Sequence, residues 1–100
     1  MIPQKTVEEL IYKHSLLEKD LSSGKVDKKL FAEKSKEYSD LNEIIENAKK
    51  YISFENDKIE LEKILGDKNT DPELLKMAET ELKDLQIEYE KNEKKLKIFL

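Results

Sequence analysis

The 100-residue chain contains no cysteine, which excludes a disulfide framework and thiolate metal sites. It also has no apolar run near the roughly 20 residues that a helix needs to span a bilayer. Its first five residues are too short and too polar for a signal peptide. We therefore expect a cytoplasmic protein that does not contact membranes.

Turn-forming residues are also scarce, and the acidic residues outnumber the basic ones. Two glycines and two prolines leave few turns, and 37% apolar with 42% charged residues suits slender helices better than a thick globule. The formal net charge is −4, which argues against DNA and against non-specific nucleic-acid binding, because that affinity comes mainly from cations that displace phosphate counterions. Any contact with RNA must therefore be local.

A first helix is predicted over about residues 6–23. Thr6 and Glu9 have the spacing of a capping box, in which the Thr6 hydroxyl and the Glu9 carboxylate bond each other's backbone N–H groups. Gly24, which easily adopts the left-handed conformation, ends the helix. The apolar stripe consists of Val7, Leu10, Leu17 and Leu21, widened by Ile11 and Leu16.

A second, long helix is predicted over about residues 27–65, capped by Asp27 and stopped by Gly66. At about 1.5 Å per residue it would be about 58 Å long. Its apolar residues follow the three-and-four spacing of heptad a and d positions. They are Phe31, Tyr38, Leu41, Ile45, Ala48, Ile52 and Ile59.

A third helix is predicted over about residues 71–98, opened by Asp71 as cap, Pro72 at the first position and Glu73 near the positive helix end. Its seam contains Leu75, Ala78, Leu82, Leu85, Tyr89, Asn92, Leu96 and Phe99. Because no Gly or Asn cap lies near Leu100, we expect the chain to continue into a further segment.

The polar turn of residues 66–70 is short enough to fold the third helix back along the second. The expected fold is therefore all-α, a single domain over residues 1–100. It is an antiparallel three-helix coiled-coil-like bundle with a long central helix and a protruding two-helix hairpin. Because its seams differ in length, we expect a marginally stable monomer or weak dimer.

Several polar residues occupy seam positions, where they weaken packing but fix register. His14 is interpreted as a packing residue and Asn92 as a register residue, because no second histidine, cysteine or acid pair completes a metal-ligand set. The other polar seam residues are Lys34, Glu55 and Glu62. The chain has no glycine-rich phosphate loop and no nucleophile beside a base, so it is predicted to have no enzymatic activity and no cofactor.

Three strings carry a specific resemblance: residues 35–41 (SKEYSDL), residues 71–78 (DPELLKMA) and residues 96–100 (LKIFL). Their order and spacing resemble the amino-terminal domain of bacterial class I peptide chain release factors, and factor 1 more than its sister factor 2. The resemblance covers the whole chain. It implies the amino-terminal part of a longer translation termination factor of the UAA/UAG type.

The resemblance also implies what this chain does not do. Factors of this family read stop codons with a Pro-x-Thr tripeptide and promote peptidyl-tRNA hydrolysis with a Gly-Gly-Gln motif, and neither motif is present here. In the family, the helical domain reaches toward the stalk base of the large ribosomal subunit. It has also been linked to the recycling GTPase release factor. The implied role is docking to the ribosome, through protein and rRNA.

Two surfaces compete as the docking site. Chain connectivity favours the turn between the second and third helices, because it lies far from Leu100, where the rest of a factor would attach. The candidate residues there are Lys63, Lys68, Asn69 and Lys76. Charge favours residues 25–36, with five lysines against two carboxylates, and residues 91–97, with four lysines against one carboxylate. We expect both segments at the end of the bundle opposite this turn. We favour the turn, because screening over about 8 Å weakens a moderate basic cluster.

Two other functions would also explain the apolar seams of the helices. One is a self-contained structural coiled coil that self-associates. The other is an adaptor that binds an amphipathic partner helix in the groove beside the first helix.

Overall fold

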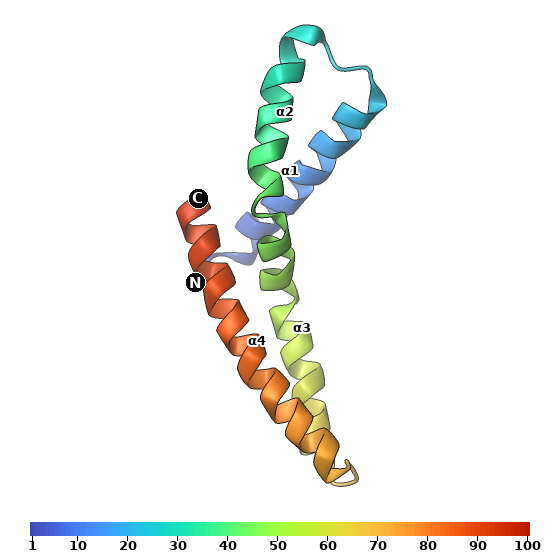
Figure 1. The fold of residues 1–100 in the computed structure, drawn as a ribbon, viewed down its shortest axis with the longest axis vertical. Helices are drawn as coiled ribbons and strands as arrows, with labels where there is room; N and C mark the ends of the chain where they lie inside the picture. Colours follow the sequence, from blue (N-terminus) through green and yellow to red (C-terminus); the bar gives the residue numbers. More distant parts are fainter.

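The computed structural model describes residues 1–100 as four helices and no strand: α1 (Gln4–Ser23), α2 (Lys28–Asn42), α3 (Ile45–Gly66) and α4 (Pro72–Phe99). The all-α class is therefore confirmed. The molecule is a rod of 61 × 26 × 20 Å in which α1 pairs with α2 toward one end and α3 pairs with α4 toward the other (Figure 1). No helix is long and apolar enough to cross a membrane.

The predicted single helix over residues 27–65 is wrong at residues 43–44, where the chain turns and divides it into α2 and α3. The Ile44 N–H bonds the Leu41 carbonyl at 3.0 Å, three residues back, and the Ala48 N–H then bonds the Ile44 carbonyl at 3.0 Å. Helix α3 contacts α1, α2 and α4, so it is packed on more than one side. The break lets two consecutive residues, Ile44 and Ile45, be buried together.

The apolar seam predicted for residues 27–65 is also absent at both of its ends. Phe31 and Ile59, expected in the seam, are 51% and 46% exposed. Below the break the buried positions of α3 are instead Ile45, Ala48, Tyr51 and Phe54, three residues apart. A spacing of three drifts around an α-helix, which carries the later seam away from Ile59.

Helix α1 begins at Gln4, two residues before the predicted start, and Pro3 takes the cap position. The Pro3 carbonyl accepts hydrogen bonds from the N–H groups of Thr6 and Val7 at 3.1 and 3.4 Å. Thr6 therefore lies inside the helix and the predicted capping box is wrong. The earlier start follows from Ile2, which is buried against α3 and α4 and fixes the entry of the chain.

The other helix ends agree with the sequence. Gly24 has φ of 71°, the left-handed conformation expected of a glycine that ends a helix. Asp27 accepts the Lys29 N–H at 3.1 Å, and Asp71 accepts the Glu73 N–H at 3.0 Å with Pro72 in the first turn. Both predicted aspartate caps are confirmed.

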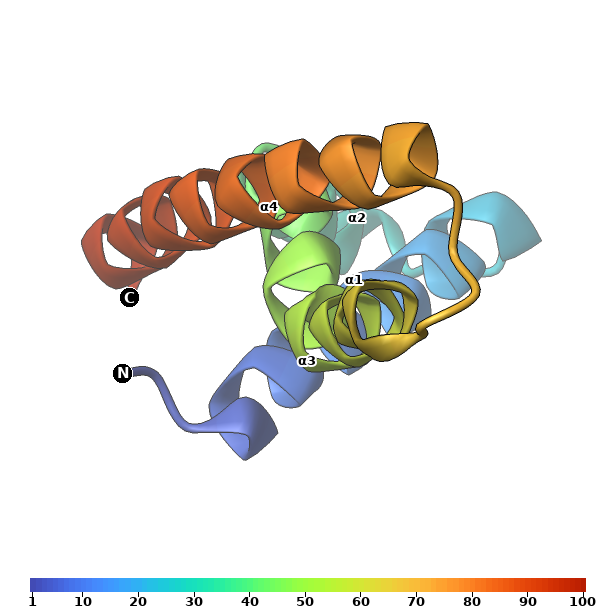
Figure 2. The ribbon, with the colours of Figure 1, turned by 90° about the horizontal axis from the view of Figure 1, so that it is seen from below.

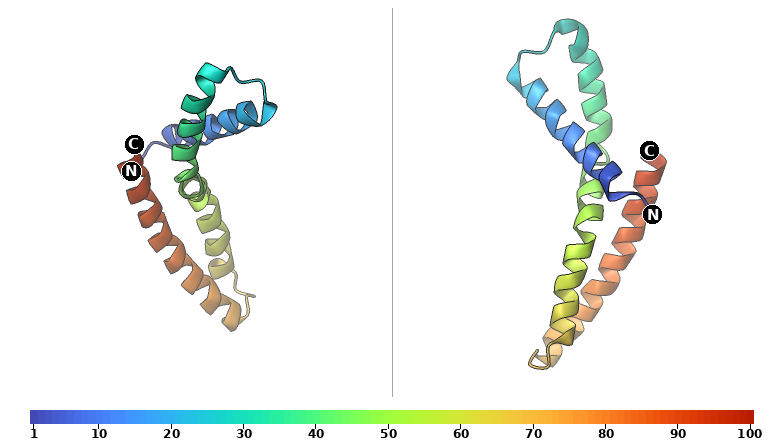
Figure 3. Two further views of the ribbon diagram at one scale, coloured as in Figure 1. Left: turned by 45° about the horizontal axis from the view of Figure 1, so that its top comes forward. Right: turned by 180° about the vertical axis from the view of Figure 1, so that it is seen from behind.

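The core lies at the middle of the rod, where the N-terminal arm, α1, α3 and α4 meet (Figure 3). Figure 2, a view along the rod, shows α3 between α1 and α4. The core consists of Ile2, Val7, Ile44, Ala48, Tyr51 and Leu96. Along α4 the predicted seam is buried or half-buried from Leu75 to Leu96, while Phe99 is 37% exposed. Away from this centre the molecule is only two helices thick.

Two of the polar seam residues, Asn92 and His14, are buried and have side-chain partners. The Asn47 amide donates to Asn92 Oδ1 at 3.0 Å, which fits a register role for Asn92. His14 is buried; its ring stacks on Tyr38 at 4.9 Å between centroids, and its Nε2 lies 3.0 Å from Asn42 Oδ1, at the last residue of α2. This pair holds α1 against the end of α2, beside the helix break.

Candidate functional site

The first candidate surface is the α3–α4 tip, defined as residues 62–77. The tip is one end of the rod (Figure 1). The predicted docking residues Lys63, Lys68, Asn69 and Lys76 are all exposed there, and none of the three lysines makes an ion pair. Lys63 lies in the last turn of α3, where a cation also offsets the helix dipole.

Local hydrogen bonds fix the shape of this turn. Asp67 accepts the Asn69 N–H at 2.9 Å on its carboxylate and the Thr70 N–H at 3.3 Å on its carbonyl. The Thr70 hydroxyl donates to the Ile64 carbonyl at 3.0 Å, which ties the turn to the last turns of α3. Because these bonds use the backbone and the side chains of Asp67 and Thr70, the side chains of Lys68 and Asn69 remain exposed.

The α3–α4 tip is not basic. It carries three lysines against four carboxylates, Glu62, Asp67, Asp71 and Glu73, a net charge of −1. Two apolar side chains are exposed beside them, Leu74 at 46% and Met77 at 59%. Mixed charge with exposed apolar side chains is typical of a surface that contacts protein.

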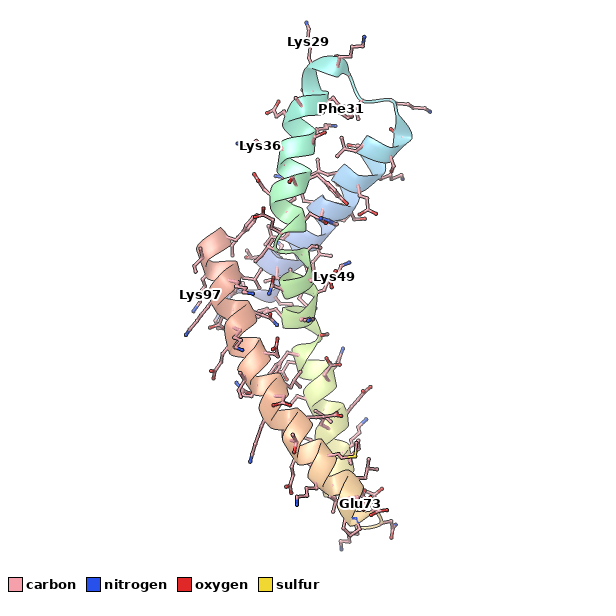
Figure 4. All side chains as sticks on the ribbon, in the orientation of Figure 1. Lys29, Phe31, Lys36, Lys49, Glu73 and Lys97 are labelled. Carbon is pink, nitrogen blue, oxygen red and sulfur yellow. The ribbon has the colours of Figure 1, made fainter.

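The second candidate surface is the α1–α2 tip, defined as residues 24–36, at the other end of the rod. Its five lysines face only two carboxylates, Asp27 and Glu33. Lys34 pairs with Asp20 of α1 at 3.1 Å. The other four lysines are exposed and make no ion pair; they are Lys25, Lys28, Lys29 and Lys36, of which Figure 4 labels the last two.

The prediction that the two basic segments lie at the same end of the molecule is wrong. Residues 25–36 and 91–97 do not share an end: the first segment forms the α1–α2 tip, whereas the second lies on α4 near the N-terminus (Figure 3). Both termini lie between the two tips, because α2 runs on past the end of α4 and pairs with α1 instead. The α3–α4 tip is still the farther of the two from Leu100, because the 28 residues of α4, about 42 Å of helix, separate that tip from Leu100 in a rod 61 Å long.

A hydrogen-bond network that sequence reasoning missed joins the N-terminal arm to α3 and α4. The Tyr51 hydroxyl accepts the Ile2 N–H and the Tyr89 hydroxyl, and it donates to Glu93 Oε2, each at 3.1 Å. Burial and the bond from Tyr89 raise the pKa of Tyr51 above its ordinary value. The ion pair with Lys97 holds the pKa of Glu93 below its ordinary value. No motif marks Tyr51, because its partners are far away in sequence.

No three histidine and carboxylate side chains lie together in a way that could hold a metal ion. The surface offers two chemically different tips at the two ends of a rod.

Comparisons with known proteins agree with the motifs. The family model described as the PCRF domain matches residues 10–100. The chain is 69% identical, over its full 100 residues, to "Peptide chain release factor 1" of Pelagibacter ubique, covering 28% of that protein. It is 38% identical to the proteins of the same name from Orientia tsutsugamushi and Agathobacter rectalis, over 91% and 94% of this chain and 25% and 26% of theirs.

No solved structure matches the chain. The chain spans about a quarter of the length of the curated relatives that it matches. The family match covers α2, α3 and α4 in full and α1 from residue 10 onward. The chain therefore belongs to the PCRF domain family, as its resemblance to peptide chain release factor 1 indicates.

Proposed function

We propose that this chain is the amino-terminal helical domain of a bacterial translation termination factor of the UAA/UAG type, and that it docks the factor on the ribosome near the large-subunit stalk base. The observation that carries the proposal is the match of the whole chain to 28% of a peptide chain release factor 1 at 69% identity. Codon reading and peptide hydrolysis belong to the remaining part of such a factor, because this chain has neither Pro-x-Thr nor Gly-Gly-Gln.

The α3–α4 tip supports a docking role. It stands at one end of a 61 Å rod, its turn is held by its own hydrogen bonds, and its side chains face solvent. We assign the contact to Lys63, Lys68, Asn69 and Lys76. The nearly neutral charge of this tip and the exposed Met77 suit a protein component of the stalk base better than bare RNA phosphates.

The test of the function uses a chimeric factor, the Pelagibacter ubique relative with its matching 100 residues replaced by this chain. A docking domain contributes binding and not chemistry, so deleting residues 1–100 should raise the factor concentration for half-maximal peptide release and leave the maximal rate nearly unchanged. A lower maximal rate at an unchanged half-maximal concentration would contradict the proposal. The isolated chain should release no peptide above the no-factor background.

The test of the tip is the double substitution Lys63→Glu with Lys68→Glu in the chimeric factor. The matched control is Lys49→Glu with Lys50→Glu, an adjacent, exposed and unpaired lysine pair in the second turn of α3, near the middle of the rod. We expect only the tip variant to weaken ribosome binding. Equal weakening by the control would mean that overall charge, rather than this tip, determines binding.

The self-contained coiled coil and the helix-binding adaptor predict a different outcome. A structural coiled coil would self-associate through its exposed apolar positions, and the chimeric factor would then release peptide no better than the deletion variant. The family match favours the termination-factor proposal over both.

A further inference from the structure

The α1–α2 tip concentrates positive charge on a chain whose other residues, taken together, are acidic. Residues 25–36 carry a charge of +3 and the whole chain −4, so the remaining residues carry −7. The rod therefore has a strong charge asymmetry along its length, and a field of this kind orients a molecule toward a polyanion. Screening over about 8 Å separates this tip from the acidic surface farther along the rod.

The lysines of this tip are available for a ligand. Lys34 is engaged by Asp20, and that pair removes a nearby carboxylate from competition. Asp27, one of the two acids of the tip, already accepts the Lys29 N–H as the helix cap. Lys25, in the loop before α2, and Lys28, Lys29 and Lys36 of α2 are exposed and have no carboxylate partner; Figure 4 labels Lys29 and Lys36.

An aromatic ring lies beside one of these cations. Phe31 is 51% exposed and follows Lys28 by three residues, so the two share a helix face. Lys29 and Lys36 are seven residues apart and share another face of α2. Cations with an exposed aromatic ring are the components of surfaces that bind unpaired nucleic acid, in which bases stack on the ring and lysines contact phosphates.

We propose that the α1–α2 tip binds RNA, with Lys25, Lys28, Lys29 and Lys36 on phosphate groups and Phe31 stacked on an unpaired base. This contact is separate from the protein-directed contact of the α3–α4 tip, which lies at the opposite end of the rod. The identification of the polyanion as RNA rests on the proposed function, because a ribosome presents RNA at most of its surface. The basic surface itself rests on the structure alone.

The experiment measures binding of the 100-residue chain to a fluorescent RNA hairpin with an unpaired loop, by fluorescence anisotropy over a range of salt concentrations. Each phosphate contact adds about one unit to the slope of log affinity against log salt. Lys28→Glu with Lys29→Glu should lower that slope by about 2 and weaken binding about ten-fold or more at low salt. Lys49→Glu with Lys50→Glu, the same charge change elsewhere, should stay within about two-fold of the parent chain.

The aromatic part has its own test. Phe31→Leu should weaken binding to the looped hairpin about ten-fold and leave binding to a fully paired duplex nearly unchanged, since only an unpaired base can stack on the ring. Tyr12→Leu is the control, because Tyr12 is 66% exposed on α1. A loss of equal size on the duplex would overturn the stacking role.

Three results would overturn the RNA proposal. They are no binding at low salt, equal weakening by the two lysine pairs, and binding of an acidic peptide as tight as that of the hairpin. Circular dichroism and the milder Lys28→Gln with Lys29→Gln variant separate lost binding from lost folding. Loss of RNA binding with intact docking of the chimeric factor would reject only this proposal, whereas RNA binding without docking would reject only the proposed function.

Discussion

The two tips of the rod are built alike and differ in chemistry. Each joins two helices through a short loop, and in each an aspartate, Asp27 or Asp71, caps the helix that follows. The α3–α4 tip has a charge of −1 and exposes Leu74 and Met77, whereas residues 25–36 have a charge of +3. The caps follow from what a helix start requires, while the lysine distribution does not. We attribute this difference to the different partners proposed for the two tips.

The tips also depend on one shared centre. Leu96 is fully buried where the N-terminal arm, α1, α3 and α4 meet, and Leu82 is only half-buried in the two-helix part of the hairpin. Leu96→Ala should lower the free energy of unfolding by about 2 to 5 kcal/mol, and Leu82→Ala by about half as much, because the smaller burial leaves less contact to lose. Urea unfolding followed by circular dichroism measures both; a larger effect at Leu82 would place the main core in the hairpin.

Tyr51 connects the N-terminal arm to both helices of the hairpin. Tyr51→Phe leaves the Ile2 N–H and the Tyr89 hydroxyl without their acceptor and should cost about 1 to 3 kcal/mol at neutral pH. The raised pKa of Tyr51 gives stability that is fully present below the ordinary tyrosine value near 10 and is lost as pH rises toward the higher folded value. Stability of the parent chain should therefore fall above about pH 10.

The control for this pH dependence is Tyr12→Phe, since Tyr12 is exposed. The Tyr51→Phe chain should lose much of the alkaline decline, and the Tyr12→Phe chain should keep it. An alkaline decline of equal size in all three chains would show that Tyr51 is not its source.

The His14–Asn42 contact offers a way to loosen one tip and not the other. Asn42→Ala removes the partner of His14 Nε2 and should cost about 1 kcal/mol, because the ring is buried but the contact lies at its edge. Hydrogen exchange should become faster in α1 and α2, and stay unchanged near the α3–α4 turn. Faster exchange at both ends would mean that the two arms unfold as one unit.

The smallest expected effects are at the caps. Asp27→Ala and Asp71→Ala should each lower the free energy of unfolding by about 1 kcal/mol. Only Asp27→Ala also removes a carboxylate from the basic tip, so it should tighten RNA binding while Asp71→Ala does not. Thermal unfolding and anisotropy on the same two variants separate the cap effect from the charge effect, and tighter RNA binding by Asp71→Ala would remove the distinction between the tips.

The sequence predicts what depends on neighbouring residues. The caps at Asp27 and Asp71, the left-handed Gly24 and the seam of α4 all follow from local rules of helix geometry, and the structure has each of them. The break at residues 43–44 carries no glycine or proline to mark it. It arises because distant elements bury Ile44 and Ile45 together, so a local pattern could not reveal it.

The candidate surfaces show the same limit. Exposure of Lys63, Lys68, Asn69 and Lys76 could be predicted from their polar turn. The position of the basic segments relative to the termini could not, because it depends on the direction in which α2 leaves the core. The role of Ile2 was also hidden, since its partners Tyr51 and Leu96 lie far along the chain.

Together, the two proposals say that the domain docks a termination factor through both of its ends. The most direct measurement is the concentration of chimeric factor that gives half-maximal peptide release, compared among three double variants: Lys28→Glu with Lys29→Glu, Lys63→Glu with Lys68→Glu, and Lys49→Glu with Lys50→Glu. We expect both tip variants to raise this concentration, the Lys49 and Lys50 variant to leave it unchanged, and all three to reach the parent's maximal rate. A tip variant that lowers the maximal rate alone, or two tip variants that behave like the Lys49 and Lys50 variant, would contradict this expectation.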